Sequence, residues 1–413
     1  MPEAVEATAD PDVPAPVLLT EPRDGVPPVV ETPGALAATI AAYAKGTGPV
    51  AVDAERASGY RYSQRAYLVQ LRRAGAGTVL IDPIACPDLG ALGGAIVDAE
   101  WILHAASQDL PCLTEIGLRP LKLFDTELAG RLLGLPRVGL AAMAEAVLGY
   151  RLEKGHSAAD WSTRPLPEPW LRYAALDVEL LIELRAALAE ELERAGKRSW
   201  AEQEFAALTA VRTPPGRREP WRRLSGIHRL RTRRQLAAAR ALWEARDEIA
   251  RARDLAPGRV LPDTAIVDAV LAAPESEEAL ARMPVFRGRA TRRYARAWYT
   301  ALAMASALPD DALPATNPPV EGPPAAHRWA ERDPAAANRL ATARDAVRAV
   351  AAENTMPTEN LIAPDAVRRL AWAPPKPATA ASVGDALRDL GARQWQVELV
   401  AAPVAQALSA VVT

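Results

Sequence analysis

The short segment Pro49–Glu55, PVAVDAE, ends in two carboxylates, Asp53 and Glu55, that are spaced two residues apart. On a β-strand this spacing places both side chains on one face, because successive side chains alternate. Carboxylates side by side repel and raise each other's pKa, and a cation held between them removes that cost. Two acids at a strand end are also a common solvated feature, so this pair alone does not identify a metal site.

Two further segments each place an acid where packing does not need one. Asp109 follows the apolar stretch Trp101–His104, and Asp177 lies inside the apolar segment YAALDVELL. Tyr173 precedes Asp177 by four residues, so the two side chains share one helix face about one turn apart. A carboxylate among leucines and valines is costly unless it binds something. Brought together, the four carboxylates and the phenol predict an oxygen cage for two hard divalent cations, Mg²⁺ or Mn²⁺.

Two such cations would clamp the attacking and leaving oxygens of an in-line phosphodiester displacement. In that arrangement Tyr173 would orient the attacking water or help to deprotonate it. The four histidines of the chain are scattered and do not indicate a zinc site. His104 stands beside the second acidic segment, where a lone histidine packs in the core or supports the metal ligands more readily than it binds a metal itself.

Composition bounds the rest of the chain. Its 413 residues are 49% hydrophobic with a formal net charge of −2, which suits two to three domains, each with its own core. Cys86 and Cys112 cannot form a disulfide framework, and a reduced, cytoplasmic compartment is the simplest expectation. The N-terminus lacks the pattern of a signal peptide, and no apolar run reaches membrane-spanning length, so we expect no membrane partner.

The first half of the chain reads as a tail followed by an α/β domain. Residues 1–25 are rich in Pro, Ala and acids and predict a disordered tail. Strands and helices alternate over residues 26–205, and AYLVQLRR, AGAG and TVLIDPI predict a hairpin, which together indicate a mixed sheet flanked by helices. We expect Ser107 to cap a helix with Asp109 in its first turn. We also expect one helix in LFDTELAGRLLG and one long helix over about residues 168–194.

The second half of the chain is almost wholly helical in pattern. A linker at 206–220 leads to a helical unit at 221–305, and a Pro-rich linker at 306–324 leads to a second unit at 325–408. Each unit has a long Arg/Ala helix, a loop with Pro and then short helices, which suggests a divergent duplication. The arginines near Arg233 and Arg234 and the later stretch RGRATRRYARAWY form basic patches that suit RNA phosphates, although solvated helix faces have the same composition.

The acidic segments resemble a known set of motifs. VDAE, HAASQDL and YAALDVELL are similar to the three motifs of the DEDD exonuclease superfamily and, more closely, to the ribonuclease D family. The third motif of that family is Y-x-x-x-D, matched by Tyr173 and Asp177, and the position that holds His in the sister group is Arg172 here. The stretch KGHSAADWSTRPL also resembles the ribonuclease D segment before the third motif. The resemblance covers about residues 26–408.

The resemblance implies a ribonuclease H-like mixed-sheet exonuclease domain (26–205) followed by two small all-α HRDC-like domains. It also implies a two-metal 3′–5′ exoribonuclease that trims RNA 3′ ends, including those of tRNA precursors, and we expect a monomer. It assigns catalysis to Asp53, Glu55, Asp109, Tyr173 and Asp177, with the four acids as metal ligands. We expect substrate contacts from Arg56, Tyr60, Tyr62, His104, Arg233 and Arg234.

Several alternatives stay open on the sequence. Arg56 departs from the apolar or small residue usual in the family, and it suits either a substrate phosphate or solvent. The loop holding Tyr60 and Tyr62 suits either stacking on terminal bases or an ordinary surface. A DNA exonuclease would use the same acidic cage, because the 2′-hydroxyl contacts that select RNA are not visible in a sequence. A non-catalytic RNA-binding scaffold would show a missing carboxylate, and none is missing.

Overall fold

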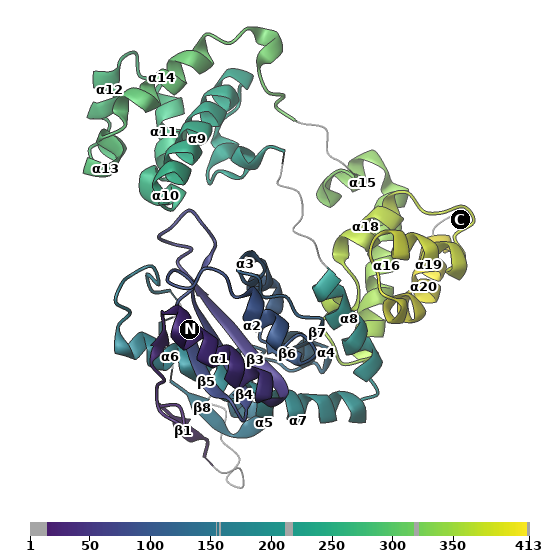
Figure 1. Ribbon diagram of the computed structural model, residues 1–413. Helices are drawn as coiled ribbons and strands as arrows, with labels where there is room; N and C mark the ends of the chain where they lie inside the picture. Colours follow the sequence, from purple (N-terminus) through teal and green to yellow (C-terminus); the bar gives the residue numbers. More distant parts are fainter. Residues whose placement is uncertain (1–14, 154, 157, 211–217, 318–321, 411–413) are drawn as a thin grey trace.

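The computed structural model describes residues 15–410 except 154, 157, 211–217 and 318–321. It shows an α/β unit followed by two helical units (Figure 1). The expected mixed sheet with flanking helices is confirmed. Across the described residues, no helix combines the length and the apolar character needed to span a membrane. Cys86 and Cys112 are both buried and unpaired with each other.

The α/β unit is built on a six-stranded sheet with the strand order β2-β5-β4-β3-β6-β7. Its strands are β2 (Val29–Val30), β3 (Thr47–Arg56), β4 (Ala66–Ala74), β5 (Gly77–Ile81), β6 (Glu100–Leu103) and β7 (Lys122–Asp125). Strand β3 pairs antiparallel with β4 and parallel with β6, so it joins the two parts of the sheet. Strands β4 and β5 form the predicted hairpin.

Helices cover both faces of this sheet. They are α1 (Pro33–Lys45), α2 (Gly90–Ala95), α3 (Leu110–Glu115), α4 (Thr126–Leu132), α5 (Leu140–Leu148), α6 (Glu168–Glu179), α7 (Leu181–Arg194) and α8 (Arg198–Ala210). Val50, Val52 and Ala54 of β3 pack into the core that also holds residues of α1, α2 and α3. Alternation along the strand therefore turns its acids toward the opposite face.

Helices α6 and α7 cover that opposite face. Ala51 of β3 packs there against Val178 and Leu181 in a small buried cluster. Asp53 and Glu55 share the face of Ala51, because they follow it at intervals of two residues. The sheet thus presents both carboxylates to the helix that carries the third acidic segment.

Two expected helices differ in the structure. The helix expected over 168–194 is two helices, because α6 ends at Glu179 and α7 begins at Leu181. The segment LFDTELAGRLLG is not wholly helical: Lys122–Asp125 form strand β7, and only α4 is a helix. Leu123 and Phe124 adopt an extended conformation and pair with β6. This tertiary contact outweighs the helical pattern of the local sequence.

The tail prediction is wrong for residues 15–25, and residues 1–14 lie outside the described part of the chain. Strand β1 (Val17–Leu19) pairs parallel with β8 (Tyr150–Leu152) in a two-stranded sheet. Arg23 then contacts Glu183 at 2.6 Å and the fully buried Glu179 at 3.8 Å. Composition alone did not predict this strand, because its partners β8, Glu179 and Glu183 lie far along the sequence.

The first helical unit has its own core. Its helices are α9 (Arg233–Arg253), α10 (Pro257–Val260), α11 (Asp263–Ala272), α12 (Glu277–Arg282), α13 (Arg289–Arg292) and α14 (Ala295–Ser306). Trp298, Phe286 and Ile266 are fully buried at the centre of this core. Thr232 begins α9 with a capping box that includes Gln235, a sequence-coded start signal.

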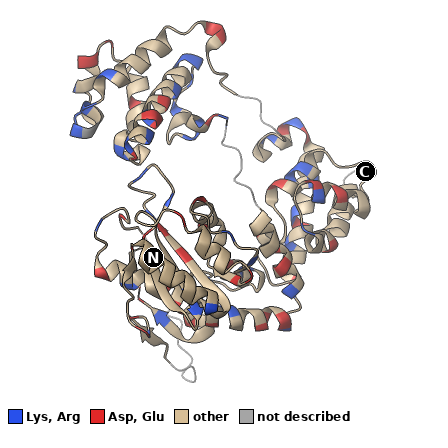
Figure 2. Ribbon diagram, in the orientation of Figure 1, with Lys and Arg blue, Asp and Glu red and all other residues tan. Residues whose placement is uncertain are grey.

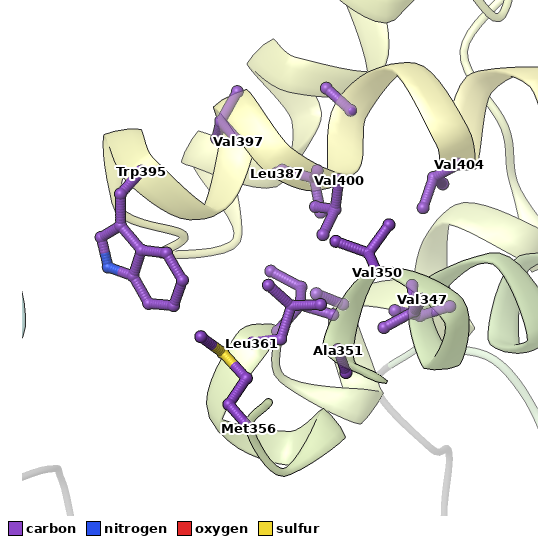
Figure 3. Packing of buried hydrophobic residues seen from close by; sticks show 14 of the residues in the cluster. Val347, Val350, Ala351, Met356, Leu361, Leu387, Trp395, Val397, Val400 and Val404 are labelled. Atoms are coloured by element: carbon purple, nitrogen blue, oxygen red, sulfur yellow. The ribbon is translucent and has the colours of Figure 1, made fainter. Parts of the chain in front are cut away.

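The second helical unit repeats the order of long helix, four-residue helix and nine- or ten-residue helix. Its helices are α15 (Trp329–Arg332), α16 (Pro334–Glu353), α17 (Thr358–Leu361), α18 (Pro364–Trp372), α19 (Ala380–Asp389) and α20 (Gln394–Ser409). Figure 3 shows Val347, Leu361, Leu387 and Val400 meeting at its centre. The same buried cluster continues into α4, α7 and α8, and Trp200 stacks on Trp395 at 5.0 Å. This unit therefore shares one core with the α/β unit.

Candidate active site

Three of the four predicted metal ligands converge in the structure. One carboxylate oxygen from each of Asp53, Glu55 and Asp177 lies within 4.8 Å of the other two. Asp53 and Glu55 come from β3, and Asp177 comes from α6, which packs across that strand. Asp109 immediately precedes α3, and its carboxylate raises the pKa of both Glu55 and Asp177. All four acids therefore occupy one region.

Burial dominates the electrostatics of this cluster. It raises the pKa of Asp53 to about 6, that of Asp109 to about 8 and that of Glu55 to about 10. The pKa of Asp177 is also well above its usual range, first through burial and then through Asp53. Neighbouring carboxylates add to the shifts at Glu55 and Asp109. A hard divalent cation is the partner that such crowded oxygens favour.

Gln70 supports Asp53 from the neighbouring strand. The register of β3 and β4 places Gln70 directly opposite Asp53, and its Nε2 donates to Asp53 Oδ2 at 3.2 Å. Gln70 is fully buried, and its Oε1 has no hydrogen-bond partner among the described residues. A buried acceptor of this kind needs a donor, and a water on a nearby cation would supply one. The four carboxylates suit a divalent metal ion as ligands, and the unpaired Oε1 of Gln70 suits a water bound to that ion.

Arg56 reaches Asp109 because the strand pairing is irregular where Arg56 stands. The register between β3 and β4 shifts between Glu55 and Arg56, and such bulges re-aim side chains beside active sites. The guanidinium nitrogen of Arg56 lies 3.5 Å from Asp109 Oδ1. Its side chain is 26% exposed and lowers the pKa of Asp53 and Asp109. The structure thus places Arg56 within the acidic site.

Asp125 holds the backbone that leads to Asp109. Ala105, after β6, takes the left-handed conformation with φ of 59°. Both oxygens of Asp125 accept from this turn, at 3.1 Å from the Ala105 N–H and 2.8 Å from the Ala106 N–H. Asp125 also caps α4 through the Leu128 N–H. It holds the turn that precedes Asp109, and its charge adds to the raised pKa of Asp109.

The expected cap by Ser107 is wrong. Ser107 lies inside a 3-10 turn (Ala106–Gln108), and Asp109 precedes α3 without a side-chain cap. The Asp125 carboxylate accepts from the N–H groups at the start of that 3-10 turn, not from the first turn of α3.

His104 is a packing residue in the described structure. Its Nδ1 lies 2.9 Å from Thr126 Oγ1. Burial lowers the pKa of His104 to about 4, so the imidazole is neutral near pH 7. Its predicted contact with substrate remains a prediction.

Tyr173 packs among aromatic rings that hold it beside Asp177. Its hydroxyl hydrogen-bonds Asp177, and burial raises its pKa above the usual value for a phenol. The Trp161 ring lies 6.4 Å and the His156 ring 6.1 Å from that of Tyr173. A Cβ at Gly155 would come within 3.0 Å of the Tyr173 ring, so glycine permits this close approach. Within the resemblance stretch, Lys154 and Ser157 lie outside the described residues.

Tyr60 and Tyr62 contact the first helical unit. The Tyr62 hydroxyl donates to Asp247 at 3.0 Å, and the guanidinium of Arg259 lies 4.1 Å from the centre of the Tyr60 ring. The expected stacking on terminal bases therefore competes with protein contacts already made by both side chains. Their role in binding substrate stays a prediction.

Arg233 and Arg234 also have partners within the protein. Arg233 donates to the carbonyls of Asp310 and Leu313 at 2.8 and 2.7 Å, and Arg234 donates to Ser306 and Leu308 at 2.8 and 2.9 Å. These contacts tie the start of α9 to the chain after α14. A structural role accounts for both side chains, and their predicted contact with RNA stays untested.

Sequence reasoning passed over Gln70 and Asp125, and over Asp254, which ends α9 and accepts from the Ser63 N–H of the loop between β3 and β4. Gln70 was visible as the one polar residue in the apolar run AYLVQL, and the hairpin register would have placed it opposite Asp53. Asp125 carried the signal of an N-cap before a helix. Asp254 gave no sequence signal, because its partners lie about 190 residues earlier in the chain.

The fold and the acids gathered by β3, α3 and α6 define a DEDD-type 3′–5′ exonuclease. Comparison with family profiles agrees: residues 27–193 match the family described as 3′–5′ exonuclease. Residues 235–302 match the HRDC domain, and residues 322–408 match the 3′ to 5′ exonuclease C-terminal domain. The second helical unit is thus described by a family profile of its own.

Comparison with individual relatives identifies the family of exonucleases to which the chain belongs. The chain is 34% identical over 282 residues to the ribonuclease D of Gluconacetobacter diazotrophicus, covering 66% of this chain and 71% of that one. The structure is similar to a crystal structure of a Bifidobacterium adolescentis protein, with a TM-score of 0.88 and 40% identity over 95% of this chain and 100% of that one. It is also similar to Escherichia coli RNase D, with a TM-score of 0.68 and 26% identity over 93% and 98%. The chain belongs to the ribonuclease D family, and it is a 3′–5′ exoribonuclease that hydrolyses phosphodiester bonds.

Proposed function

We propose that the protein removes nucleotides from RNA 3′ ends by a two-metal mechanism, with Mg²⁺ or Mn²⁺ held by Asp53, Glu55, Asp109 and Asp177. The observation that carries the proposal is the set of three carboxylate oxygens within 4.8 Å of one another, from β3 and α6. When bound, the two ions would activate the attacking water and stabilise the departing 3′ oxygen.

The protein's own residues would orient the reactants. Tyr173 has a raised pKa and stays protonated near neutral pH, so its hydroxyl can hold a water by hydrogen bonding beside Asp177. Gln70 fixes the rotamer of Asp53 through its Nε2. Arg56 offers a guanidinium that suits a phosphate oxygen at the scissile bond.

We further propose that structured RNA, including tRNA precursors, is the substrate. Escherichia coli RNase D, to which this structure is similar, is an exoribonuclease involved in structured RNA processing. Figure 2 shows Lys and Arg over both helical units. Arg289, Arg292 and Arg296 in α13 and α14 are exposed and form no ion pair within the described residues. Such free cations suit the phosphates of an RNA body without reading its sequence.

We also propose that a single chain is sufficient for activity. The acids in the site all come from one chain, and Tyr173 comes from the same helix as Asp177. Light scattering in solution would test this: a monomer that retains full activity supports it, and activity confined to a dimer would contradict it.

The nuclease proposal is tested with a 5′-labelled RNA hairpin that carries a single-stranded 3′ tail. In Mg²⁺ the tail should shorten in single-nucleotide steps, and chelation should stop the reaction. Asp53→Asn should slow it by about a thousandfold, equivalent to ~4 kcal/mol of barrier. Tyr173→Phe should slow it by about tenfold to a hundredfold.

The matched control is Asp98→Asn, which changes an exposed acid elsewhere on the α/β unit. It should leave the rate unchanged.

A tRNA precursor with an extended 3′ end and an unstructured RNA of equal length should then be compared. Equal degradation of the two throughout their length would contradict the proposed substrate, and a wild-type rate in Asp53→Asn would contradict the mechanism.

A further inference from the structure

The loop between β3 and β4 connects the acidic strand to the first helical unit. Residues 57–65 begin directly after Arg56, and their contacts run to the end of α9 and to α10. Figure 1 shows this loop reaching toward α10, away from the body of the sheet. The contacts with that unit fall into three groups, centred on Asp254, on Arg259 and on the Tyr62 hydroxyl, which contacts Asp247 and Arg251.

Asp254 is the centre of the first group. It ends α9 in the left-handed conformation with φ of 46°, which Asp and Asn tolerate better than most residues. Its Oδ1 accepts from the Ser63 N–H at 2.9 Å, and its Oδ2 accepts from the Tyr67 hydroxyl at 3.3 Å. Arg65 lies 4.0 Å from the same carboxylate. One side chain therefore gathers three residues that enter β4.

Arg259 is the centre of the second group. Its Nε donates to the Gly59 carbonyl at 2.8 Å, and its guanidinium lies 4.1 Å from the centre of the Tyr60 ring. Three residues earlier, the Ala256 N–H donates to the Tyr60 carbonyl at 3.0 Å. These contacts fix the backbone of the loop itself, not only its side chains.

The other side of the loop contacts the segment that supports Tyr173. Arg61 Nε donates to Ser162 Oγ at 2.7 Å, and the Tyr60 hydroxyl donates to the Ala158 carbonyl at 3.4 Å. Trp161, between these residues, packs in the same buried cluster as Tyr173. The loop thus links the helical unit to the acidic strand β3 and to the segment that packs against Tyr173.

We propose that Asp254 is a positioning residue for phosphodiester hydrolysis, acting through the β3–β4 loop. The first helical unit then sets the geometry of the active site as well as offering a surface to RNA. Its effect extends to RNA too short to touch the helical unit's basic surface. This inference rests on the proposed function, since it concerns the rate of that reaction.

The test uses the full-length protein with Mg²⁺ and a trinucleotide RNA. Asp254→Ala should lower kcat on the trinucleotide on the order of tenfold, because small misplacements of reacting groups are costly, with little change in KM. Asp254→Asn should restore most of the rate, because Asn tolerates the left-handed conformation and keeps an oxygen for the Ser63 N–H. Asp268→Asn is the matched control: Asp268 pairs with Arg229 inside the same unit, away from the loop.

Hydrogen exchange supplies a readout that does not depend on activity. In Asp254→Ala the amides of residues 57–67 and 158–164 should exchange faster than in the wild type, and in Asp268→Asn they should not. Arg259→Gln, which removes a different contact to the same loop, should reproduce both effects if Asp254→Ala proves too unstable to purify.

The inference is overturned if Asp254→Ala and Arg259→Gln both keep wild-type kcat on the trinucleotide, or if exchange in the loop is unchanged. A loss on long RNA alone would also overturn it, because that result assigns the helical unit to RNA binding only. If the wild type shows no Mg²⁺-dependent hydrolysis, the proposed function fails instead, and the exchange experiment still decides whether Asp254 holds the loop.

Discussion

The guanidinium of Arg56 lies 3.5 Å from the carboxylate of Asp109, inside a site otherwise crowded with acids. Asp109 does not join the 4.8 Å group formed by Asp53, Glu55 and Asp177. Arg56 therefore acts as the counter-ion of Asp109 in the metal-free protein. A second cation that uses Asp109 must compete with it.

Replacing Arg56 with Gln should have two opposite effects. The metal-free protein should melt at a lower temperature, because the carboxylates lose a neighbouring positive charge. The apparent affinity for Mn²⁺ should rise by about fivefold, or ~1 kcal/mol, because a competing cation is gone. Calorimetric titration without RNA measures this directly. Arg119→Gln, at an exposed position of the same unit, is the control, and weaker Mn²⁺ binding in Arg56→Gln would contradict the competition.

The stability of the metal-free protein should fall as the pH rises from about 4 to 8. Burial raises the pKa of Asp53 to about 6 and that of Asp109 to about 8, so the folded state retains protons that the unfolded state has released. The stabilisation is full below the unfolded pKa near 4 and is lost as the pH passes the folded values. Thermal melting in chelator at several pH values measures it.

Metal should reverse this trend, because cations bind the deprotonated carboxylates. The protection given by Mg²⁺ should therefore grow with pH, and Asp109→Asn should weaken the dependence on pH. A melting temperature in chelator that rises steadily from pH 5 to 8 would count against the raised pKa values.

Asp125→Ala should disturb the active site, although Asp125 is not one of the four predicted metal ligands. Three backbone N–H groups lose their acceptor, and the fold should lose about 3 kcal/mol. Activity should fall further than stability explains, because the turn at Ala105 and Ala106 positions Asp109. Rates and urea unfolding of the same variant separate the two effects. An enzyme that is less stable but has an unchanged kcat at low temperature would show that Asp125 is structural only.

The two groups of arginines should behave differently toward RNA. Arg292→Gln with Arg296→Gln should leave stability unchanged, weaken binding of structured RNA and flatten its dependence on salt. Arg233→Gln with Arg234→Gln should instead destabilise the helical unit, by about 1–2 kcal/mol, because both side chains bind backbone carbonyls. Filter binding over a salt series and melting curves distinguish them. Equal salt slopes for the first pair and the wild type would exclude that surface.

Local rules were enough to predict the centre of the site. Alternation along β3 placed Asp53 and Glu55 on one face, and helical spacing placed Tyr173 beside Asp177. Convergence of these segments could be expected because isolated acids in apolar stretches are unfavourable. These predictions needed no knowledge of distant contacts.

Features that depend on distant pairing could not be predicted in the same way. Strand β1 pairs with β8, which lies far along the chain, and β7 is extended beside β6 although its sequence has a helical pattern. The loop of Tyr60 and Tyr62 has a composition equally suited to bases and to protein. Its partner Arg259 lies 200 residues further along the chain from Gly59.

The most direct test of the two-metal site is the number of Mn²⁺ ions bound by the protein without RNA, counted by electron paramagnetic resonance for the wild type and for Asp53→Asn. We predict two ions in the wild type and the loss of at least one in the variant, since Asp53 contributes to the group of converging oxygens. Equal stoichiometry and affinity in the two proteins would contradict this prediction.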